Sequence, residues 1–176
     1  MQFINLLTTP TGAQLLKAKA GIHPALSSAL LKEVEKLNFI QEFGRGTAWL
    51  GERGLDYRYA GRSHIAQGVT PIISVFSAYL NQLADEKYNH ILVNQYKPGQ
   101  KLNKHKDDEK ELKGSIASLS LGAPAFFDYT ADRVKLLHGD LLIGNRQFFN
   151  ELPHGVSKPL QEGRDRYNIT WRTISK

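Results

Sequence analysis

The chain has 176 residues, of which 41% are hydrophobic, and a formal net charge of +6 at pH 7. It contains no cysteine, which excludes a disulfide framework, a thiol nucleophile and a cysteine-ligated zinc site, and which fits a reducing compartment. The basic balance favours a polyanionic partner, nucleic acid first, although many enzymes of other kinds are also basic.

The first residues, MQFINLLTTPTGAQLL, lack a basic start followed by a long apolar run, so we expect no secretory leader. No stretch of the sequence reaches the apolar length of a membrane span. We therefore expect a monomer of the cytoplasm, or of the nucleus or nucleoid, that works away from membranes. At this length we expect one domain with a substantial hydrophobic core.

Two helices are predicted in the first half of the chain. Residues 23–39, HPALSSALLKEVEKLNF, carry apolar residues at helical spacing, and so do residues 70–88, TPIISVFSAYLNQLADEKY. Pro24 and Pro71 suit the first turns, and Thr70 suits the N-cap of the second helix. The expected buried stripes are Leu26, Leu30, Val34 and Leu37 in the first helix, and Ile72, Phe76, Tyr79, Leu80 and Leu83 in the second.

The rest of the chain reads as short strands. Residues 46–62, GTAWLGERGLDYRYAGR, suggest two strands around a glycine-rich turn. From residue 90 onward, glycine- and proline-containing turns separate the runs HILVNQY, SIASLSL, PAFFDY, RVKLL, DLLIG and RYNITWRTI. Many short strands with such turns predict a sandwich or barrel. We therefore expect an α+β fold, mainly β, in which two helices pack on a jelly-roll half.

The last run has an unusual polar face. Alternate side chains of a strand point to opposite faces. One face carries Arg166, Asn168, Thr170 and Arg172, and the other carries Tyr167, Ile169 and Trp171. A solvated outer face is the ordinary explanation. If the polar face is buried instead, its guanidiniums need partners, and arginine is suited to bidentate carboxylate recognition. Asn94 and Tyr96 alternate in the same way in HILVNQY and can add neutral donors.

Two His-x-Asp triplets, His105 with Asp107 and His138 with Asp140, each offer an imidazole and a carboxylate on one side of an extended segment. A third ligand is expected from a distant strand that folds back. From Asp107 to His154 there are 47 positions, enough for several strands, whereas Asp140 leaves only 14. The spacing favours His105, Asp107 and His154, although such triplets also occur by chance. We expect His138 to hydrogen-bond a neighbouring turn.

Two histidines and one carboxylate on one face leave open metal positions, which suits Fe(II) enzymes that bind a co-substrate and O₂ together. From Asn94 to Arg172 the chain also resembles the AlkB family of Fe(II)/2-oxoglutarate-dependent dioxygenases. The matching pieces are NQYKPGQKLNKHKDDE, SLSLGAPAFF, LLHGDLLIG, PHGV and RYNITWR, in this order. A weaker match, TAWLGERGLDYRYAG, looks like the family's nucleotide-recognition lid. This segment and the HKDDE form look closer to the DNA/RNA-repair branches of the family than to its peptide- or lipid-linked branches. The first 40 residues match nothing that we can place.

The resemblance implies a double-stranded β-helix, or jelly roll, in residues 90–176, with supporting helices and a recognition lid in residues 1–89. It implies that His105, Asp107 and His154 hold Fe(II), and that 2-oxoglutarate and O₂ are co-substrates. Arg172 with Asn94 would bind the 2-oxoglutarate carboxylate near the metal, and Arg166 with Tyr96 and Asn168 would bind the distal one. His138 falls at a position that is not a ligand in the family. The lead into His154, GNRQFFNELPHGV, lacks the family's usual Trp or Tyr, which leaves that pocket wall undefined.

The implied activity is oxidative demethylation of N-alkylated bases in DNA or RNA, of the 1-methyladenine and 3-methylcytosine type. Hydroxylation of the N-methyl group would be coupled to 2-oxoglutarate decarboxylation, and formaldehyde would be released. Tyr57, Tyr59 and Glu109 fall where the family contacts the damaged base, although ordinary strand aromatics and a solvated turn also explain them. The alternatives are a hydroxylase of a protein or small molecule, and a non-catalytic nucleic-acid-binding module.

The basic surplus would then bind the phosphate backbone of that nucleic acid. Arg45, Arg53 and the segment 62–64 lie near the proposed lid in the sequence. Phe43 is a candidate wedge for the gap that a flipped base leaves, although a core position is the ordinary expectation for a phenylalanine.

Overall fold

The computed structural model describes residues 1–51, 56–59 and 62–175, and of residues 56–59 only the backbone is considered. The helices are α1 (Pro24–Val34), α2 (Pro71–Ala84) and α3 (Arg146–Glu151). The strands are β1 (Phe3–Thr8), β2 (Gln14–Ala18), β3 (Ile40–Glu42), β4 (Arg45–Gly51), β5 (Asp56–Tyr59), β6 (Arg62–Ile65), β7 (His90–Tyr96), β8 (Leu102–His105), β9 (Leu112–Gly122), β10 (Ala125–Tyr129), β11 (Asp132–Leu136), β12 (Leu141–Gly144), β13 (His154–Val156) and β14 (Arg166–Ile174).

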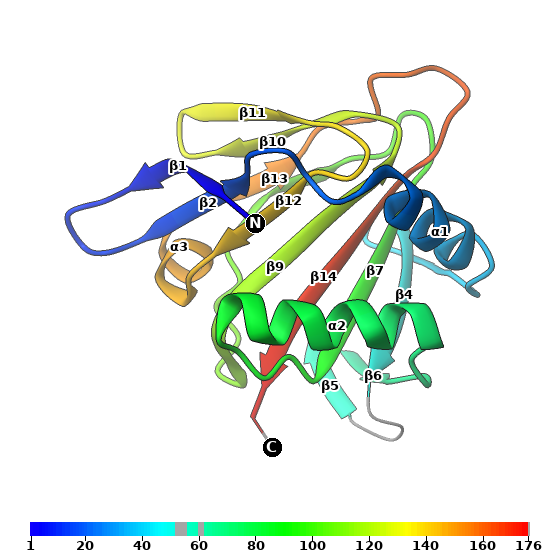
Figure 1. The fold of residues 1–176 in the computed structure, drawn as a ribbon, viewed down its shortest axis with the longest axis horizontal. Coiled ribbons are helices and arrows are strands. Elements are labelled where there is room, and N and C mark those ends of the chain that lie inside the picture. The colour runs from blue at the N-terminus through cyan, green and yellow to red at the C-terminus, as the bar shows by residue number, and fades with distance from the viewer. Residues whose placement is uncertain (52–55, 60–61, 176) are drawn as a thin grey trace.

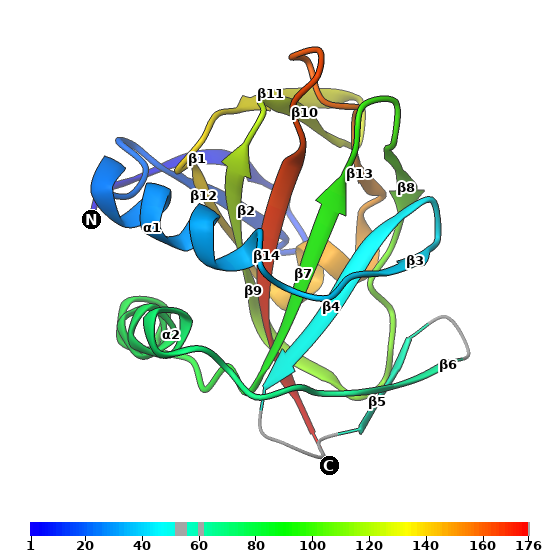
Figure 2. The ribbon, with the colours of Figure 1, turned by 90° about the vertical axis from the view of Figure 1, so that its right-hand side faces the viewer.

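Most of these strands form two sheets that face each other. The large sheet has the order β1-β2-β12-β9-β14-β7-β4-β3, and the small sheet has the order β11-β10-β13-β8. Helices α1 and α2 cover the outer face of the large sheet, and the small sheet lies over part of its inner face (Figure 1, Figure 2). This mainly β arrangement confirms the predicted jelly roll, and all six β runs predicted after residue 90 are strands.

The first 51 residues supply both edges of the large sheet, which the sequence did not predict. Strands β1 and β2 form an antiparallel pair, and β2 continues the sheet beside β12. At the opposite edge, β3 pairs with β4, which lies beside β7. The segment expected to contain helices and a lid with two short strands therefore also builds both edges of the large sheet.

The two long helices begin at their predicted prolines but are shorter than predicted. Helix α2 ends at Ala84 because Asp85 adopts the left-handed conformation, with φ 50°. Thr70 occupies the N-cap, but its side chain makes no capping hydrogen bond. The prediction that Tyr79 belongs to the buried stripe was wrong, since it is 42% exposed, and Ile73 reaches the core instead.

Strand β14 lies in the middle of the large sheet, between β9 and β7. Its apolar face packs against the helices. The Trp171 Nε1 donates to Ser77 Oγ at 2.7 Å, and the indole lies 5.4 Å from the Phe76 ring. Its polar face is buried as well, with Arg166 1% and Arg172 5% exposed. The solvated-face explanation of the polar pattern is therefore excluded.

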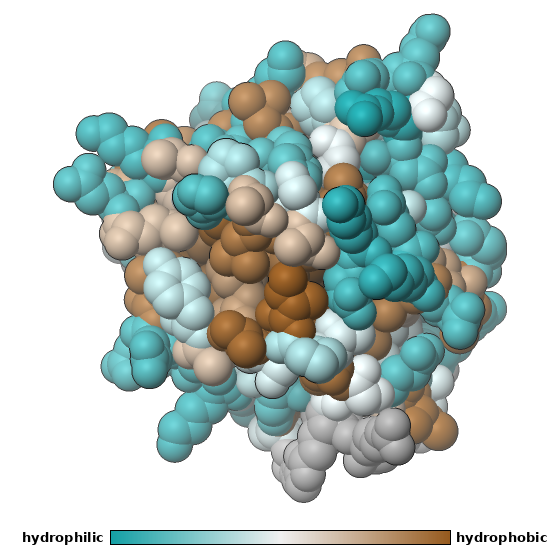
Figure 3. Space-filling view, turned by 45° about the vertical axis from the view of Figure 1, so that its right-hand side comes forward, coloured by the Kyte–Doolittle hydropathy of each residue, from teal (hydrophilic) through white to brown (hydrophobic). Residues whose placement is uncertain are grey.

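Figure 3 shows apolar side chains gathered in one region of the surface and hydrophilic side chains around them. On α2, Val75 is 73% exposed and Tyr79 is half-exposed. None of the helices within residues 1–51 and 62–175 has the length and apolar character that a membrane crossing needs.

We expect Ile169→Ala to lower the free energy of unfolding by about 2–5 kcal/mol, because Ile169 is fully buried between β14 and the helices. Val75→Ala is the matched control on the exposed face of α2, and its effect should stay within about 0.5 kcal/mol. Urea denaturation measures both changes. Equal effects of the two substitutions would contradict the packing described for β14.

Candidate active site

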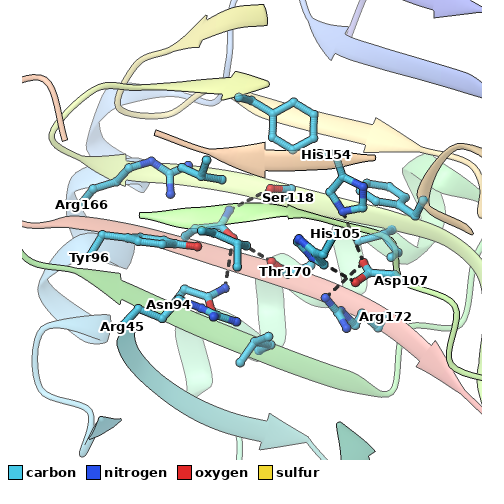
Figure 4. A pocket seen from close by; sticks show the side chains of 17 residues that line it. Arg45, Asn94, Tyr96, His105, Asp107, Ser118, His154, Arg166, Thr170 and Arg172 are labelled. Carbon is cyan, nitrogen blue, oxygen red and sulfur yellow. Dashed lines mark hydrogen bonds and ion pairs between the residues drawn. The ribbon is translucent and has the colours of Figure 1, made fainter. Parts of the chain in front are cut away.

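A pocket lies between the inner face of the large sheet and the small sheet. Its walls come from β4, β7, β9 and β14 on one side, and from β8, β10 and β13 on the other. Figure 4 shows the polar side chains of both sheets pointing into this space. The sheet alternation that buries the polar face of β14 therefore aims it at the small sheet.

The three predicted metal ligands meet at one end of the pocket. His105 ends β8 and His154 begins β13, and the two residues are directly opposite in the pairing of these strands. Asp107 follows β8 and turns its buried carboxylate toward both imidazoles. One potential ligand atom from each residue lies within 4.8 Å of the others.

Hydrogen bonds fix which nitrogen each imidazole presents. His105 Nδ1 lies 3.1 Å from the Asn103 carbonyl oxygen, and His154 Nδ1 lies 3.0 Å from the Leu152 carbonyl oxygen. A carbonyl only accepts, so each Nδ1 carries the proton, and Nε2 of the neutral ring keeps its lone pair. These Nε2 atoms lie 3.4 and 3.8 Å from the oxygens of Asp107. Electron-rich atoms facing one another in this way fit a cation between them.

The ionisation states suit that cation. Burial lowers the pKa of His154 to about 4 although Asp107 opposes the shift, so this ring is neutral at pH 7. Burial alone would raise the pKa of Asp107, but the Arg172 guanidinium and the two histidines outweigh it and hold that pKa well below its usual range. Arg172 Nη2 lies 3.3 Å from Asp107 Oδ2. The site therefore offers one carboxylate and a neutral imidazole at neutral pH.

Helix α3, which the sequence did not predict, braces this end of the pocket. Arg146 donates to the backbone carbonyl oxygens of Asp107, at 2.5 Å, and of Glu109, at 3.1 Å. The Asp107 N–H donates to the Phe149 carbonyl oxygen at 2.9 Å. The Phe149 ring stands edge-on to the His154 imidazole, 5.0 Å away. Phe149 of α3 thus forms part of the pocket wall that the sequence left undefined.

At the other end of the pocket, Arg166 is completely enclosed. Its Nη2 donates to Ser120 Oγ at 2.9 Å, and its guanidinium lies 5.3 Å from the centre of the Tyr96 ring. Among the described residues, its Nε and Nη1 have no hydrogen-bond partner. Burial lowers the pKa of this guanidinium, because removal from water destabilises its charged form. A buried cation with unused donors fits a bound carboxylate.

Between these ends, four polar side chains form the floor of the pocket. Asn168 faces Asn94 across the β14–β7 pair, and their side chains lie 3.4 Å apart. The Asn168 amide donates to Ser118 Oγ at 2.8 Å, and Thr170 Oγ1 donates to Asn168 Oδ1 at 2.8 Å. Figure 4 shows the floor running between Arg166 and Arg172.

The family model of the 2OG-Fe(II) oxygenase superfamily matches residues 4–172. The chain belongs to this superfamily. Fe(II), 2-oxoglutarate and O₂ are the metal and co-substrates that the superfamily implies, and the two ends of the pocket fit the first two. The resemblance to AlkB proteins is also confirmed by the curated relatives.

The chain is 30% identical over 172 residues to the DNA oxidative demethylase ALKBH2 of Bos taurus, covering 82% of this chain and 62% of that protein. It is 38% identical over 101 residues to the α-ketoglutarate-dependent dioxygenase AlkB of Escherichia coli, covering 48% of this chain and 45% of that protein. The chain thus matches less than two thirds of the length of either relative.

Two solved structures share the fold of this superfamily member. The structure of OsALKBH1 gives a TM-score of 0.66 at 21% identity, covering 90% of this chain and 97% of that one. The viral collagen prolyl hydroxylase of Paramecium bursaria Chlorella virus-1 gives 0.64 at 16% identity, covering 92% and 96%.

The predicted base-contacting residues are only partly described. The side chains of Tyr57 and Tyr59 lie outside the described residues, although the backbone of β5 pairs with β6 and sets Tyr57 opposite His64. His64 is buried and stacks on Trp49 at 4.3 Å, which packs β6 against β4. Glu109 is half-buried, and burial together with Asp107 raises its pKa although Arg172 opposes the shift.

The structure also shows where His138 and Arg45 lie. His138 accepts a hydrogen bond from the Gly122 N–H at 3.1 Å, which confirms its structural role at a turn. Arg45 was expected near the lid to bind phosphate, but it is only 2% exposed and lines the pocket. Sequence reasoning also missed Ser118 and Ser120, whose alternation with apolar residues in SIASLSL was the available signal.

Proposed function

We propose that this protein is an Fe(II)- and 2-oxoglutarate-dependent demethylase of alkylated bases in nucleic acid. The observation that carries the proposal is the pocket, which joins three converging metal-ligand side chains to a buried guanidinium with unused donors. Membership of the 2OG-Fe(II) oxygenase superfamily and similarity to AlkB proteins support the same function.

His105 Nε2, His154 Nε2 and the Asp107 carboxylate would hold Fe(II). Arg172 would keep Asp107 ionised and oriented, and Arg146 would fix the backbone that carries it. When bound, Fe(II), 2-oxoglutarate and O₂ supply an oxidative decarboxylation, which yields succinate and CO₂ and transfers one oxygen atom to a substrate C–H bond.

Arg166 and Tyr96 would bind the distal carboxylate of 2-oxoglutarate, and Arg172 and Asn94 would bind the carboxylate near the metal. The two arginines are six positions apart, so their Cα atoms lie roughly 20 Å apart along the strand, and their side chains shorten this span. Asn168 was expected to bind the ligand directly. Because its amide group already donates to Ser118 and Leu119, we propose that it orders the floor instead.

The substrate would be a base bearing an N-methyl group and a positive charge. Hydroxylation of that methyl group gives an N-hydroxymethyl base, which loses formaldehyde and restores the N–H or the neutral ring nitrogen. Glu109, which follows Asp107 at the metal end, would favour a cationic base. Tyr57 and Tyr59 would stack on the base, with a cation–π contribution of about 0.5–2 kcal/mol.

A groove outside the pocket suits the rest of a nucleic-acid strand. Leu102, His105 and Arg45 line both the pocket and this groove. Its other residues include Phe43, Gln100, Lys101, Asn103 and Lys104. Positive charge beside an exposed aromatic ring is a common way to bind single strands.

Phe43 lies at the tip of the β3–β4 turn, so the expectation of a core position was wrong. It is 40% exposed, adopts φ 50°, and has the Arg62 guanidinium 5.6 Å from its ring centre. Phe43 and Gly44 both have positive φ, as a two-residue hairpin turn between β3 and β4 requires, and this turn places the Phe43 ring at the surface. The exposed ring supports, as a proposal, the role of a wedge beside a flipped base.

We expect His154→Ala to weaken Fe(II) binding at least tenfold, because it removes a ligand atom from the three-residue cluster. His138→Ala is the matched control, since His138 serves a turn and lies outside the pocket lining. Anaerobic isothermal titration calorimetry with Fe(II) measures both. Equal affinities of the two variants would disprove the proposed metal site.

We expect Arg166→Lys to weaken 2-oxoglutarate binding at least tenfold, because lysine lacks the planar fork that engages a carboxylate. Arg133→Lys on β11 is the control, since Arg133 is exposed, contacts Asp128 and the Phe126 ring, and does not line the pocket. Titration of 2-oxoglutarate into the anaerobic Fe(II)-loaded protein measures the change. Unchanged 2-oxoglutarate affinity in Arg166→Lys would contradict the proposed binding role of Arg166.

We expect succinate release by the wild-type protein to rise when an oligonucleotide carrying 1-methyladenine or 3-methylcytosine is added. Mass spectrometry of the oligonucleotide should show the loss of one CH₂ per repaired base, and His154→Ala should show neither effect. A panel of single- and double-stranded DNA and RNA identifies the preferred polymer. Intact Fe(II) and 2-oxoglutarate binding without stimulation by any of them would favour a hydroxylase of another substrate class.

A further inference from the structure

Arg45 is a third enclosed arginine of the pocket, and neither of the proposed co-substrate contacts uses it. It begins β4, and within the described residues no carboxylate lies at ion-pair distance from it. Its Nε instead donates to Asn94 Oδ1 at 2.6 Å, and its Nη1 makes a long contact of 3.5 Å with the Phe43 carbonyl oxygen. An enclosed guanidinium is costly, so its placement against a neutral amide calls for an explanation.

The Arg45 contact decides which way the Asn94 amide points. A guanidinium only donates, so the Asn94 atom that faces it at 2.6 Å is the oxygen. The Asn94 NH₂ group must then point along the floor, where it lies 3.4 Å from Asn168 Oδ1. This second contact is long, whereas the Arg45 contact is short and charge-assisted, so Arg45 is the stronger determinant.

The orientation of the Asn168 amide, at the other end of this chain of hydrogen bonds, is fixed in the same way by its neighbours. The Leu119 carbonyl only accepts, and it lies 3.2 Å from the Asn168 amide nitrogen, which also donates to Ser118. Both N–H bonds of Asn168 are therefore used within the floor. One N–H of Asn94 has no partner assigned by these contacts, which leaves Asn94 as the amide donor for a carboxylate in the pocket.

We propose that Arg45 is a positioning residue that holds the Asn94 amide with its N–H group toward the co-substrate. This inference rests on the proposed 2-oxoglutarate site. Arg45 acts through Asn94, and it also joins the floor to the β3–β4 turn through Phe43. Without Arg45, the amide can rotate and present its oxygen to the carboxylate, which repels it.

The test measures 2-oxoglutarate affinity by calorimetry on the anaerobic Fe(II)-loaded protein. We expect about a tenfold loss for Arg45→Met, because a charge-assisted hydrogen bond is lost and the donor is no longer oriented. Arg45→Lys should recover part of the affinity, because lysine also only donates. Asn94→Asp keeps an acceptor for Arg45 but removes the donor, so it should bind 2-oxoglutarate as poorly as Arg45→Met or worse.

A double-mutant cycle separates positioning from general damage. Asn94→Ala and Arg45→Met should each weaken binding, and the double variant should be about as weak as the weaker single variant. Fe(II) affinity should stay unchanged in Arg45→Met, since Arg45 touches none of the proposed ligands. Arg133→Met on exposed β11 is the matched control for loss of one positive charge. Wild-type affinity in Arg45→Met, or fully additive losses, would overturn the inference. Failure of the wild-type protein to bind 2-oxoglutarate would instead overturn the proposed function together with it.

Discussion

The burial of the polar face of β14 is the constraint on which the rest of the molecule depends. A central strand that is buried on both faces needs a layer on each side, and the helices cover its apolar face while the small sheet covers its polar one. Two guanidiniums are thereby enclosed, which is unfavourable unless each has partners. Arg172 has the Asp107 carboxylate, whereas Arg166 contacts Ser120 and the Tyr96 ring and has no carboxylate at ion-pair distance within the described part of the chain. The small sheet that closes the pocket is also the sheet that brings both histidines.

The balance of charge inside the pocket follows from this arrangement. Within the described residues, three enclosed arginines, Arg45, Arg166 and Arg172, line the pocket with one ionised carboxylate, that of Asp107. His154 is neutral because it is buried. Such a pocket attracts an anion at its distal end, while Asp107 and the imidazole lone pairs attract a cation at the other. In the proposed arrangement, a divalent metal would lie at the Asp107 end and a carboxylate of the co-substrate at the Arg166 end.

Arg45 connects the chemistry of the pocket with the groove outside it. Its strand begins directly after the β3–β4 turn that exposes Phe43, and its guanidinium contacts both that turn and the pocket floor. A nucleic-acid strand in the groove would therefore lie close to a residue that orders the co-substrate site. The stacking of the His64 ring on Trp49 attaches the β5–β6 hairpin to the same strand, β4.

The sequence by itself determined the strands after residue 90 and the alternation of β14, and its spacing singled out His105, Asp107 and His154, which the structure brings together. These features are local or depend on spacing, because side-chain direction in a strand repeats every two residues. Only the tertiary structure decided that the polar face is buried, that β1 and β2 join the large sheet beside β12, and that Arg45 lies in the pocket. Short α3 has too few residues for a periodic signal, and its role at Asp107 comes from contacts across 37 to 42 positions. These features all depend on which distant segments pair or pack together. The sequence of one strand does not specify which other strand lies beside it.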